Sequence, residues 1–179
     1  MRILLLALAL LAPLGGGDDW KPLHRALHLP QAGATCPTSP TRQLGKWPFS
    51  YSGPVYLQNV GSAPVRGEID VSQSIPDRQG WLTQKTPWLV PASYRGPVLI
   101  RGTRIDAPGS ISFAKGFGDH LAELRYRTGE SNGARTRITG LPGRYRFLAS
   151  AAGFRAAGCY AFQIDGSNFS SVIVMRVKG

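Results

Sequence analysis

The chain of 179 residues is poor in cysteine, histidine and acidic residues, and it lacks a long hydrophobic stretch. It holds two cysteines, three histidines and ten acidic residues. The acidic residues are scattered, so no two of them stand out as a carboxylate pair for glycoside hydrolysis. The longest apolar run, residues 3–14, is shorter than the roughly 20 residues of a transmembrane helix. The sequence therefore predicts no transmembrane segment in the mature chain and no identifiable carboxylate pair.

No segment of helical length repeats its apolar residues with a period of 3.6. Short apolar runs instead alternate with turn-forming residues, and the chain holds 22 glycines and 14 prolines. This pattern is typical of an all-β fold. We expect an antiparallel β-sandwich, immunoglobulin-like in architecture. The expected strands are 54–60, 65–71, 84–90, 96–105, 110–114, 121–127, 135–139, 144–150, 158–164 and 169–177.

Three regions differ in composition. Residues 1–17 combine one positive charge, an apolar run and three glycines, which together predict a secretory signal peptide. Residues 18–43 are rich in Pro, Ala and Thr and are expected to form an N-terminal tail or linker. Residues 44–179 form the expected β-sandwich domain. The protein is thus expected to be secreted, either extracellular or in the cell envelope; an uncleaved anchor at a membrane surface is the alternative.

The C-terminal stretch GCYAFQIDGSNFSSVIVMRV, residues 158–177, predicts a hairpin. Tyr160, Phe162 and Ile164 alternate with other residues and therefore share one face of a strand. The Asp165–Gly166 pair that follows is a strong turn signal, because glycine accepts a positive φ. Both strands are strongly apolar, which favours a place inside a sheet rather than at its edge.

The two cysteines, Cys36 and Cys159, allow two interpretations. A catalytic thiol at Cys159 needs a neighbouring base, and His120 is the only histidine of the predicted domain. A chain in an oxidising compartment usually pairs its cysteines. We therefore expect a Cys36–Cys159 disulfide, with a Cys159–His120 pair as the alternative.

Three short motifs do not predict a site. Ser112 and Lys115 have the S-x-x-K spacing of serine acyl-enzymes, but they lie where a strand enters a glycine-rich loop instead of on a helix. His24 and His28 are spaced for metal binding but lack further ligands. The GFGDHL segment, residues 116–121, lacks the third glycine of a nucleotide-binding loop. The sequence therefore identifies no catalytic residue, no metal site and no cofactor.

Positive charge is the strongest compositional signal, with 21 basic residues and a formal net charge of +11. One interpretation is an ordinary solvated basic surface. The other is an anion-binding face, because three successive R-x-R motifs are predicted on strands, where residues two apart share a face. If these strands form a meander, Tyr126, Thr136 and Tyr145 point inward. The candidate binding residues would then be Arg125, Arg127, Arg135, Arg137, Arg144 and Arg146. Like charges this close need an anionic partner.

Aromatic residues offer a different binding surface. Trp47, Trp81 and Trp88 flank predicted strands and could stack on carbohydrate. Packing in the core is the competing interpretation, and the solvent exposure of Trp81 and Trp88 distinguishes the two.

The segments YSGPVYLQ, KTPWLVPASYRGPVLIRG and the C-terminal GCYAFQIDGSNFSSVIVMRV resemble a group of small exported bacterial proteins of unassigned function. The similarity covers residues 36–177. It implies a single β-sandwich-like domain and no known reaction, so it assigns no functional residue.

The sequence predicts a secreted non-catalytic binding module that recognises an anionic polymer, a polysaccharide or an envelope surface. It has no specific nucleic-acid signature, and the oligomeric state stays open. The first alternative is a hydrolase acting on wall or polysaccharide substrates; the second is a structural envelope protein. A cleft that holds two carboxylates, or one carboxylate with His120, favours the enzyme, whereas a flat basic sheet face favours the binding module.

Overall fold

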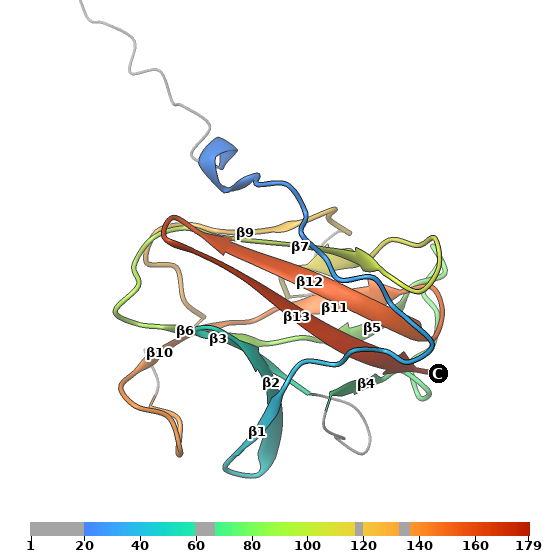
Figure 1. The fold of residues 1–179 in the computed structure, drawn as a ribbon, viewed down its shortest axis with the longest axis horizontal. Helices are drawn as coiled ribbons and strands as arrows, with labels where there is room; N and C mark the ends of the chain where they lie inside the picture. The colour runs from blue at the N-terminus through green and yellow to red at the C-terminus, as the bar shows by residue number, and fades with distance from the viewer. Residues whose placement is uncertain (1–19, 60–66, 117–119, 133–136) are drawn as a thin grey trace, which may run out of the picture.

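A computed structural model describes residues 20–59, 67–116, 120–132 and 137–179 of the chain (Figure 1). Over these ranges the fold is nearly all β, with one short 3-10 helix, η1 (Lys21–Leu23), and no α-helix. No helix in the described ranges is long and apolar enough to cross a membrane. The predicted all-β class is confirmed, with antiparallel sheets in a sandwich-like arrangement.

The described strands form three sheets. Sheet A has the order β1 (Thr41–Leu44), β2 (Trp47–Ser52), β3 (Val55–Gln58), β6 (Trp88–Pro91), β10 (Tyr145–Leu148). Sheet B has the order β4 (Glu68–Asp70), β13 (Phe169–Lys178), β12 (Gly158–Gly166), β7 (Val98–Arg104), β9 (Leu124–Tyr126). Sheet C has the order β5 (Leu82–Lys85), β11 (Ala151–Phe154), β8 (Ser112–Ala114). Neighbouring strands are antiparallel except β4 and β13, which are parallel.

The three sheets share one main hydrophobic core. Trp88 of sheet A, Phe162 of sheet B and Phe113 of sheet C are all fully buried in it. The ring of Phe162 lies 5.5 Å from that of Trp88 and 6.2 Å from that of Phe113, both edge to face. The indole N–H of Trp88 is satisfied by the hydroxyl of Ser150 at 3.0 Å. Large aromatic side chains from each sheet therefore hold the layers together.

The C-terminal hairpin is confirmed as β12 and β13, which both lie inside sheet B. Its turn, however, is formed by residues 167 and 168, because Asp165 pairs with Ser170 and Gly166 with Phe169. Gly166 has no positive φ. It is small for a different reason: a Cβ at this position would collide with the Phe169 ring. The predicted Asp-Gly turn is therefore wrong by two residues, although the hairpin it indicated is present.

The strand predictions differ from the structure in three places. The expected strand 84–90 is divided between β5 and β6, in separate sheets. Residues 137–139 form no strand, and the first two residues of the expected strand 135–139 lie outside the described ranges. The expected strands did not include β1, β2 or β11: TRQL is polar, WPFSYS contains a proline, and AAGF lacks β-branched residues.

Residues 20–43 are packed against the domain instead of extending from it as a tail. The segment crosses the outer face of sheet B and then enters β1 (Figure 1). Leu29, Ala32 and Cys36 cover Ala161 of β12 in a small apolar cluster. The predicted Cys36–Cys159 disulfide is confirmed, with the two Cα atoms 5.5 Å apart. The small side chains on this face of β12 thus make room for the crossing segment.

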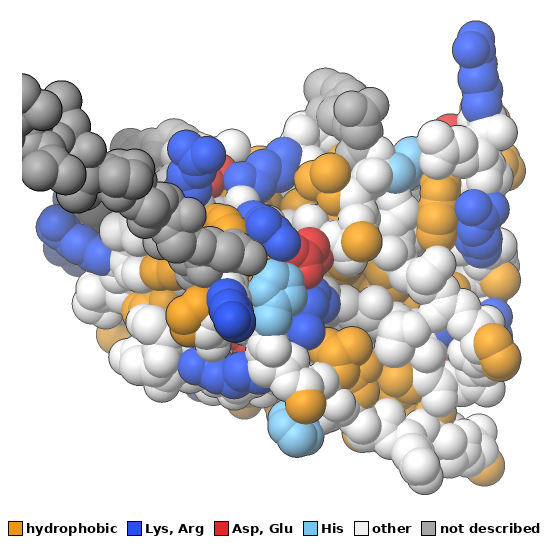
Figure 2. Space-filling model, turned by 90° about the horizontal axis from the view of Figure 1, so that it is seen from above, with side chains coloured by type: hydrophobic (Ala, Val, Ile, Leu, Met, Phe, Trp, Pro, Cys, Tyr) orange, Lys and Arg blue, Asp and Glu red, His pale blue; other side chains and the backbone are white. Residues whose placement is uncertain are grey.

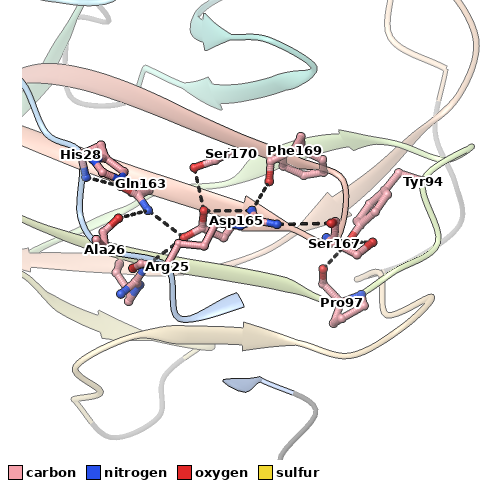
Figure 3. Close-up of polar contacts among 11 residues, drawn as sticks. Arg25, Ala26, His28, Tyr94, Pro97, Gln163, Asp165, Ser167, Phe169 and Ser170 are labelled. Atoms are coloured by element: carbon pink, nitrogen blue, oxygen red, sulfur yellow. Dashed lines mark hydrogen bonds and ion pairs between the residues drawn. The ribbon is translucent and has the colours of Figure 1, made fainter. Parts of the chain in front are cut away.

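A buried carboxylate fastens the start of the same segment. Asp165 is fully buried on β12, and its oxygens accept hydrogen bonds from Gln163 at 3.0 Å and Ser170 at 2.7 Å (Figure 3). They also accept a hydrogen bond from Arg101 at 2.9 Å. Arg25 of the crossing segment lies 3.4 Å from the same carboxylate. A buried charge needs such partners, because it would otherwise be desolvated without compensation.

Gln163 joins the crossing segment to β12 through both ends of its amide. The amide nitrogen donates to the carbonyl oxygen of Ala26 at 3.0 Å, and the amide oxygen accepts from the backbone N–H of His28 at 2.8 Å. Figure 3 shows both bonds beside Asp165. The polar residues of β12 therefore bind the N-terminal segment at one end, and the disulfide binds it at the other.

Candidate functional site

The predicted meander of arginine-bearing strands is not formed. Arg125 lies on β9 of sheet B, whereas Arg146 lies on β10 of sheet A. Arg137 is exposed but outside any strand. Arg135 lies outside the described residues. The arginine pairs therefore do not line one sheet face. Tyr126 and Tyr145 are buried as expected, and Thr136 lies outside the described residues.

Arg146 has no exposed surface and serves the fold. Its guanidinium donates to the backbone oxygens of Glu130 at 2.9 Å, Gly96 at 2.9 Å and Arg127 at 3.1 Å. Carbonyl oxygens that point into the protein need donors, and a guanidinium supplies several in one plane. Arg146 as a surface binding residue is therefore wrong.

The other described arginines of the six remain on the surface. Arg125, Arg127, Arg137 and Arg144 are exposed. Arg125 donates from Nε to Glu123 at 2.5 Å, so part of its charge is already balanced. Figure 2 shows basic side chains in separate groups with acidic and histidine side chains among them. The flat basic sheet face on which the binding prediction depended is not found in the described part of the chain.

Two of the three tryptophans pack inside the domain. Trp88 is fully buried and Trp81 is 8% exposed, which favours core packing over a carbohydrate platform. Trp47 is 38% exposed, and the Nζ of Lys46 lies 5.4 Å from its ring centroid. A single exposed tryptophan does not make a platform.

The carboxylates of the described acidic residues all have polar or charged partners. Each acidic residue in the described ranges interacts with a basic residue, a histidine or a backbone N–H. These interactions are Glu68–Lys178, Asp70–Ser72 N–H, Asp77–His120, Asp106–Arg104, Glu123–Arg125, Glu130–Lys115 and Asp165–Arg101. No group of three or more metal-ligating side chains is found among the described residues. Cys159 is in the disulfide, so the alternative Cys159–His120 pair is wrong.

A groove of about 770 Å³ lies against sheet C. It is lined by Asp77, Thr83, Gln84, Lys85, Pro87, Ala114, Gly116, His120, Phe147, Ala149, Ser150 and Ala151. The register of the sheet explains the space. Lys85, Ala151 and Ala114 are direct neighbours across the three strands, so two of the three positions in this row carry only a methyl group.

Side-chain alternation gives sheet C two different faces. Phe113 and Ala152 point into the main core and have no exposed surface. Ser112 and Ala114 flank Phe113 on β8 and therefore point to the opposite face, toward the groove. Gly153 pairs with Ser112, and the Trp81 side chain packs so closely over Gly153 that an added Cβ would lie 3.1 Å from Trp81 Cβ. Ser112 is consequently on the groove face but only 4% exposed.

His120 stands beside Ser112 because the chain folds back along β8. Phe113 and Leu121 exchange two backbone hydrogen bonds of 2.8 and 2.7 Å. This bridge places the Nδ1 of His120 in a hydrogen bond with the Ser112 hydroxyl. The other ring nitrogen, Nε2, lies 2.6 Å from Oδ2 of Asp77. The imidazole therefore joins a serine hydroxyl to a carboxylate.

A tight loop fixes the direction of the Asp77 carboxylate. Oδ1 accepts the backbone N–H groups of Gln79 at 2.8 Å and Trp81 at 3.0 Å, which leaves Oδ2 to face His120. The hydrogen bond from the Trp81 N–H, with those from Gln79 and His120, lowers the pKa of Asp77. Gly80 closes this loop at φ 79°, a conformation that favours glycine. Asp77 is therefore ionised and oriented at neutral pH.

The sequence analysis named a cleft with His120 and one carboxylate as a feature that favours an enzyme, and Asp77 and His120 meet this description. It did not identify Asp77 as that carboxylate or Ser112 as a member of the cluster. Ser112 and His120 were each considered with other partners, and Asp77 was one of several scattered acids. No local spacing connects residues 77, 112 and 120; sheet register and one chain reversal bring them together.

No family model, curated protein or solved structure matches this chain. The resemblance to small exported bacterial proteins therefore stays a prediction.

Proposed function

We propose that the protein is an exported binding module and that its ligand site is the groove against sheet C. The observation that carries the proposal is a groove of about 770 Å³ whose lining combines three alanines with the polar side chains of His120 and Asp77. This volume falls in the range of small-molecule sites, roughly 300–1,000 Å³. The disulfide supports the export part of the proposal, because such bonds persist in oxidising compartments.

The lining indicates the class of ligand. Ala114, Ala151, Pro87 and Phe147 offer apolar surface, and Lys85 brings a positive charge to the floor row. A compact apolar molecule with an acidic or hydrogen-bond-accepting group matches this combination. The site replaces the arginine face, whose meander geometry the fold does not contain.

The test is binding of 1-anilinonaphthalene-8-sulfonate, an apolar dye with one negative charge, by the full disulfide-bonded chain. We expect saturable binding with a change in the fluorescence of Trp81, whose ring centroid lies 5.8 Å from that of His120 at the groove. The Ala151→Phe variant fills the floor and should weaken binding about tenfold or more. The matched variant Ala107→Phe, at an exposed loop position, should bind as the parent does.

Charge is tested separately. Lys85→Gln should weaken binding of the anionic dye and leave the neutral analogue N-phenyl-1-naphthylamine unaffected. A folded Ala151→Phe protein that binds both dyes like the parent would overturn the proposal, as would the absence of saturable binding.

A further inference from the structure

The Ser112–His120–Asp77 chain has the hydrogen-bond polarity of an activated nucleophile. An ionised carboxylate can only accept hydrogen bonds, so the Nε2 of His120 must carry the proton that it shares with Asp77 at 2.6 Å. On a neutral imidazole, Nδ1 then carries the lone pair, so the Ser112 hydroxyl is the donor in the hydrogen bond between them. A serine that donates to a neutral imidazole, itself oriented by a carboxylate, is the arrangement of serine acyl-transfer enzymes.

We propose that Ser112 is the nucleophile of a carboxylic-ester hydrolase, that His120 is its general base and that Asp77 is a positioning residue. The inference rests on the proposed function, because the ester would occupy the same groove. The roles of the two ring nitrogens are exchanged relative to serine proteases, in which Nε2 faces the serine. Either nitrogen can act as the base once the other is held in the N–H form.

The location of the cluster agrees with this role. His120 and Asp77 line the groove, and Ser112 shares the groove face of β8 with Ala114. Ser112 is 4% exposed and its hydroxyl is hydrogen-bonded to His120, whose ring centroid lies 5.8 Å from that of Trp81. The guanidinium carbon of Arg155 lies 4.1 Å from the Trp81 ring centroid, and Arg155 donates to the Gln79 carbonyl oxygen at 2.7 Å. Arg155 therefore holds the loop that carries Asp77 and Trp81.

The reaction balances without a cofactor. Ser112 Oγ attacks the ester carbon while its proton passes to Nδ1 of His120. The tetrahedral intermediate collapses, the C–O bond to the alcohol breaks, and the alcohol leaves with the proton from Nδ1. A water molecule then attacks the acyl-serine, giving one proton to Nδ1. Collapse releases the carboxylic acid and returns that proton to Ser112 Oγ.

The experiment measures covalent labelling and turnover on the full chain. Diisopropyl fluorophosphate should add one phosphoryl group to Ser112, located by mass spectrometry of the peptides. Hydrolysis of 4-nitrophenyl acetate should fall about 100-fold or more in Ser112→Ala, and no adduct should form. The matched variant Ser110→Ala, at an exposed serine two residues away, should keep both labelling and rate.

The pH dependence of kcat tests whether Asp77 positions His120, because loss of a purely structural contact would not change it. Asp77→Asn should lower kcat with little change in KM and alter the pH dependence of kcat, and Asp77→Glu should restore part of the rate. If Ser112→Ala does not fold, Ser112→Cys serves instead and should react with iodoacetamide faster than a free thiol does.

The two proposals fail in different ways. Saturable binding of the anilinonaphthalene dye without an adduct at Ser112 would overturn the catalytic inference alone. A turnover that survives Ser112→Ala, or an adduct elsewhere in the chain, would also overturn it. Absence of both dye binding and labelling would overturn the binding module as well.

Discussion

Arg146 donates a hydrogen bond from its Nε to the backbone oxygen of Glu130 at 2.9 Å, from a side chain with no exposed surface. The same guanidinium holds the chain near residues 96 and 127. One side chain on β10 thus fixes two loops that approach sheet A from other parts of the sequence.

Replacement of Arg146 by methionine should destabilise the protein strongly. The variant leaves several inward carbonyl oxygens without donors, so we expect a loss of about 3 kcal/mol or more in the free energy of unfolding. Urea unfolding followed by circular dichroism measures it. Arg137→Met, at an exposed arginine outside any strand, should change stability by less than about 0.5 kcal/mol. Equal effects of the two substitutions would contradict a buried structural role.

Removal of the disulfide should lower stability by about 4 kcal/mol in the Cys36→Ser, Cys159→Ala double variant. The bond joins residues 123 positions apart, so its loss frees a long loop in the unfolded chain. Urea titrations of the parent with and without reductant provide an independent measurement. If reduction leaves the transition midpoint in place, the predicted contribution of the bond is wrong.

Asp165→Asn should release the N-terminal segment. The change leaves Arg25 and Arg101 with an uncharged partner in a buried setting, and we expect a loss of about 3 kcal/mol. Limited trypsin digestion should then cleave after Arg25 faster than in the parent. Asp106→Asn removes a more exposed carboxylate bonded to Arg104 and should cost less than about 1 kcal/mol. Unchanged cleavage after Arg25 would show that the carboxylate does not hold the segment.

The Glu123 carboxyl should titrate below its ordinary range. Burial opposes ionisation, but hydrogen bonds from Arg125 and His24 outweigh it and lower the pKa of Glu123 from 4.5. Because the folded pKa is below the unfolded one, ionised Glu123 stabilises the fold above the unfolded pKa. That contribution is lost as the pH falls through the folded pKa.

The stability difference between the parent and Glu123→Gln should therefore be present at about pH 7 and absent at about pH 2. Urea unfolding at both pH values measures the difference, and carboxyl NMR follows the titration directly. In Arg125→Gln the pKa of Glu123 should rise toward its ordinary value. A difference in stability that is the same at both pH values would argue against the ion pair as its source.

Sequence patterns correctly predicted the features that depend only on neighbouring residues, such as which side chains of a strand share a face. The alternation of Tyr160, Phe162 and Ile164 depends only on strand geometry, and the hairpin it predicts is present. The disulfide followed from cysteine number and compartment. The R-x-R alternation, in contrast, states which residues share a face of one strand but not which sheet the strand joins. Arg146 is buried because backbone carbonyl oxygens of two loops accept its hydrogen bonds, and no pattern in the neighbouring sequence predicts this burial.

The candidate site could not be predicted from the sequence, because it too depends on which strands pair. Ser112 points toward the groove because Phe113 takes the core side of β8, which depends on the pairing of β8 with β11. His120 reaches it through a chain reversal, and Asp77 through a separate loop. Each residue is ordinary in its own stretch of sequence, and their chemistry arises only from long-range register.

The crossing segment has a consequence for how the chain reaches its final state. Arg25 and Cys36 are synthesised early, but Asp165 and Cys159, which they contact, both belong to β12, the last strand but one. During synthesis Arg25 and Cys36 therefore stay without these partners until almost the whole chain is complete. Contacts over such separations slow folding and prolong the exposure of incomplete sheets. The N-terminal segment around Arg25 and Cys36 is therefore synthesised first but can make these contacts only at the end of synthesis.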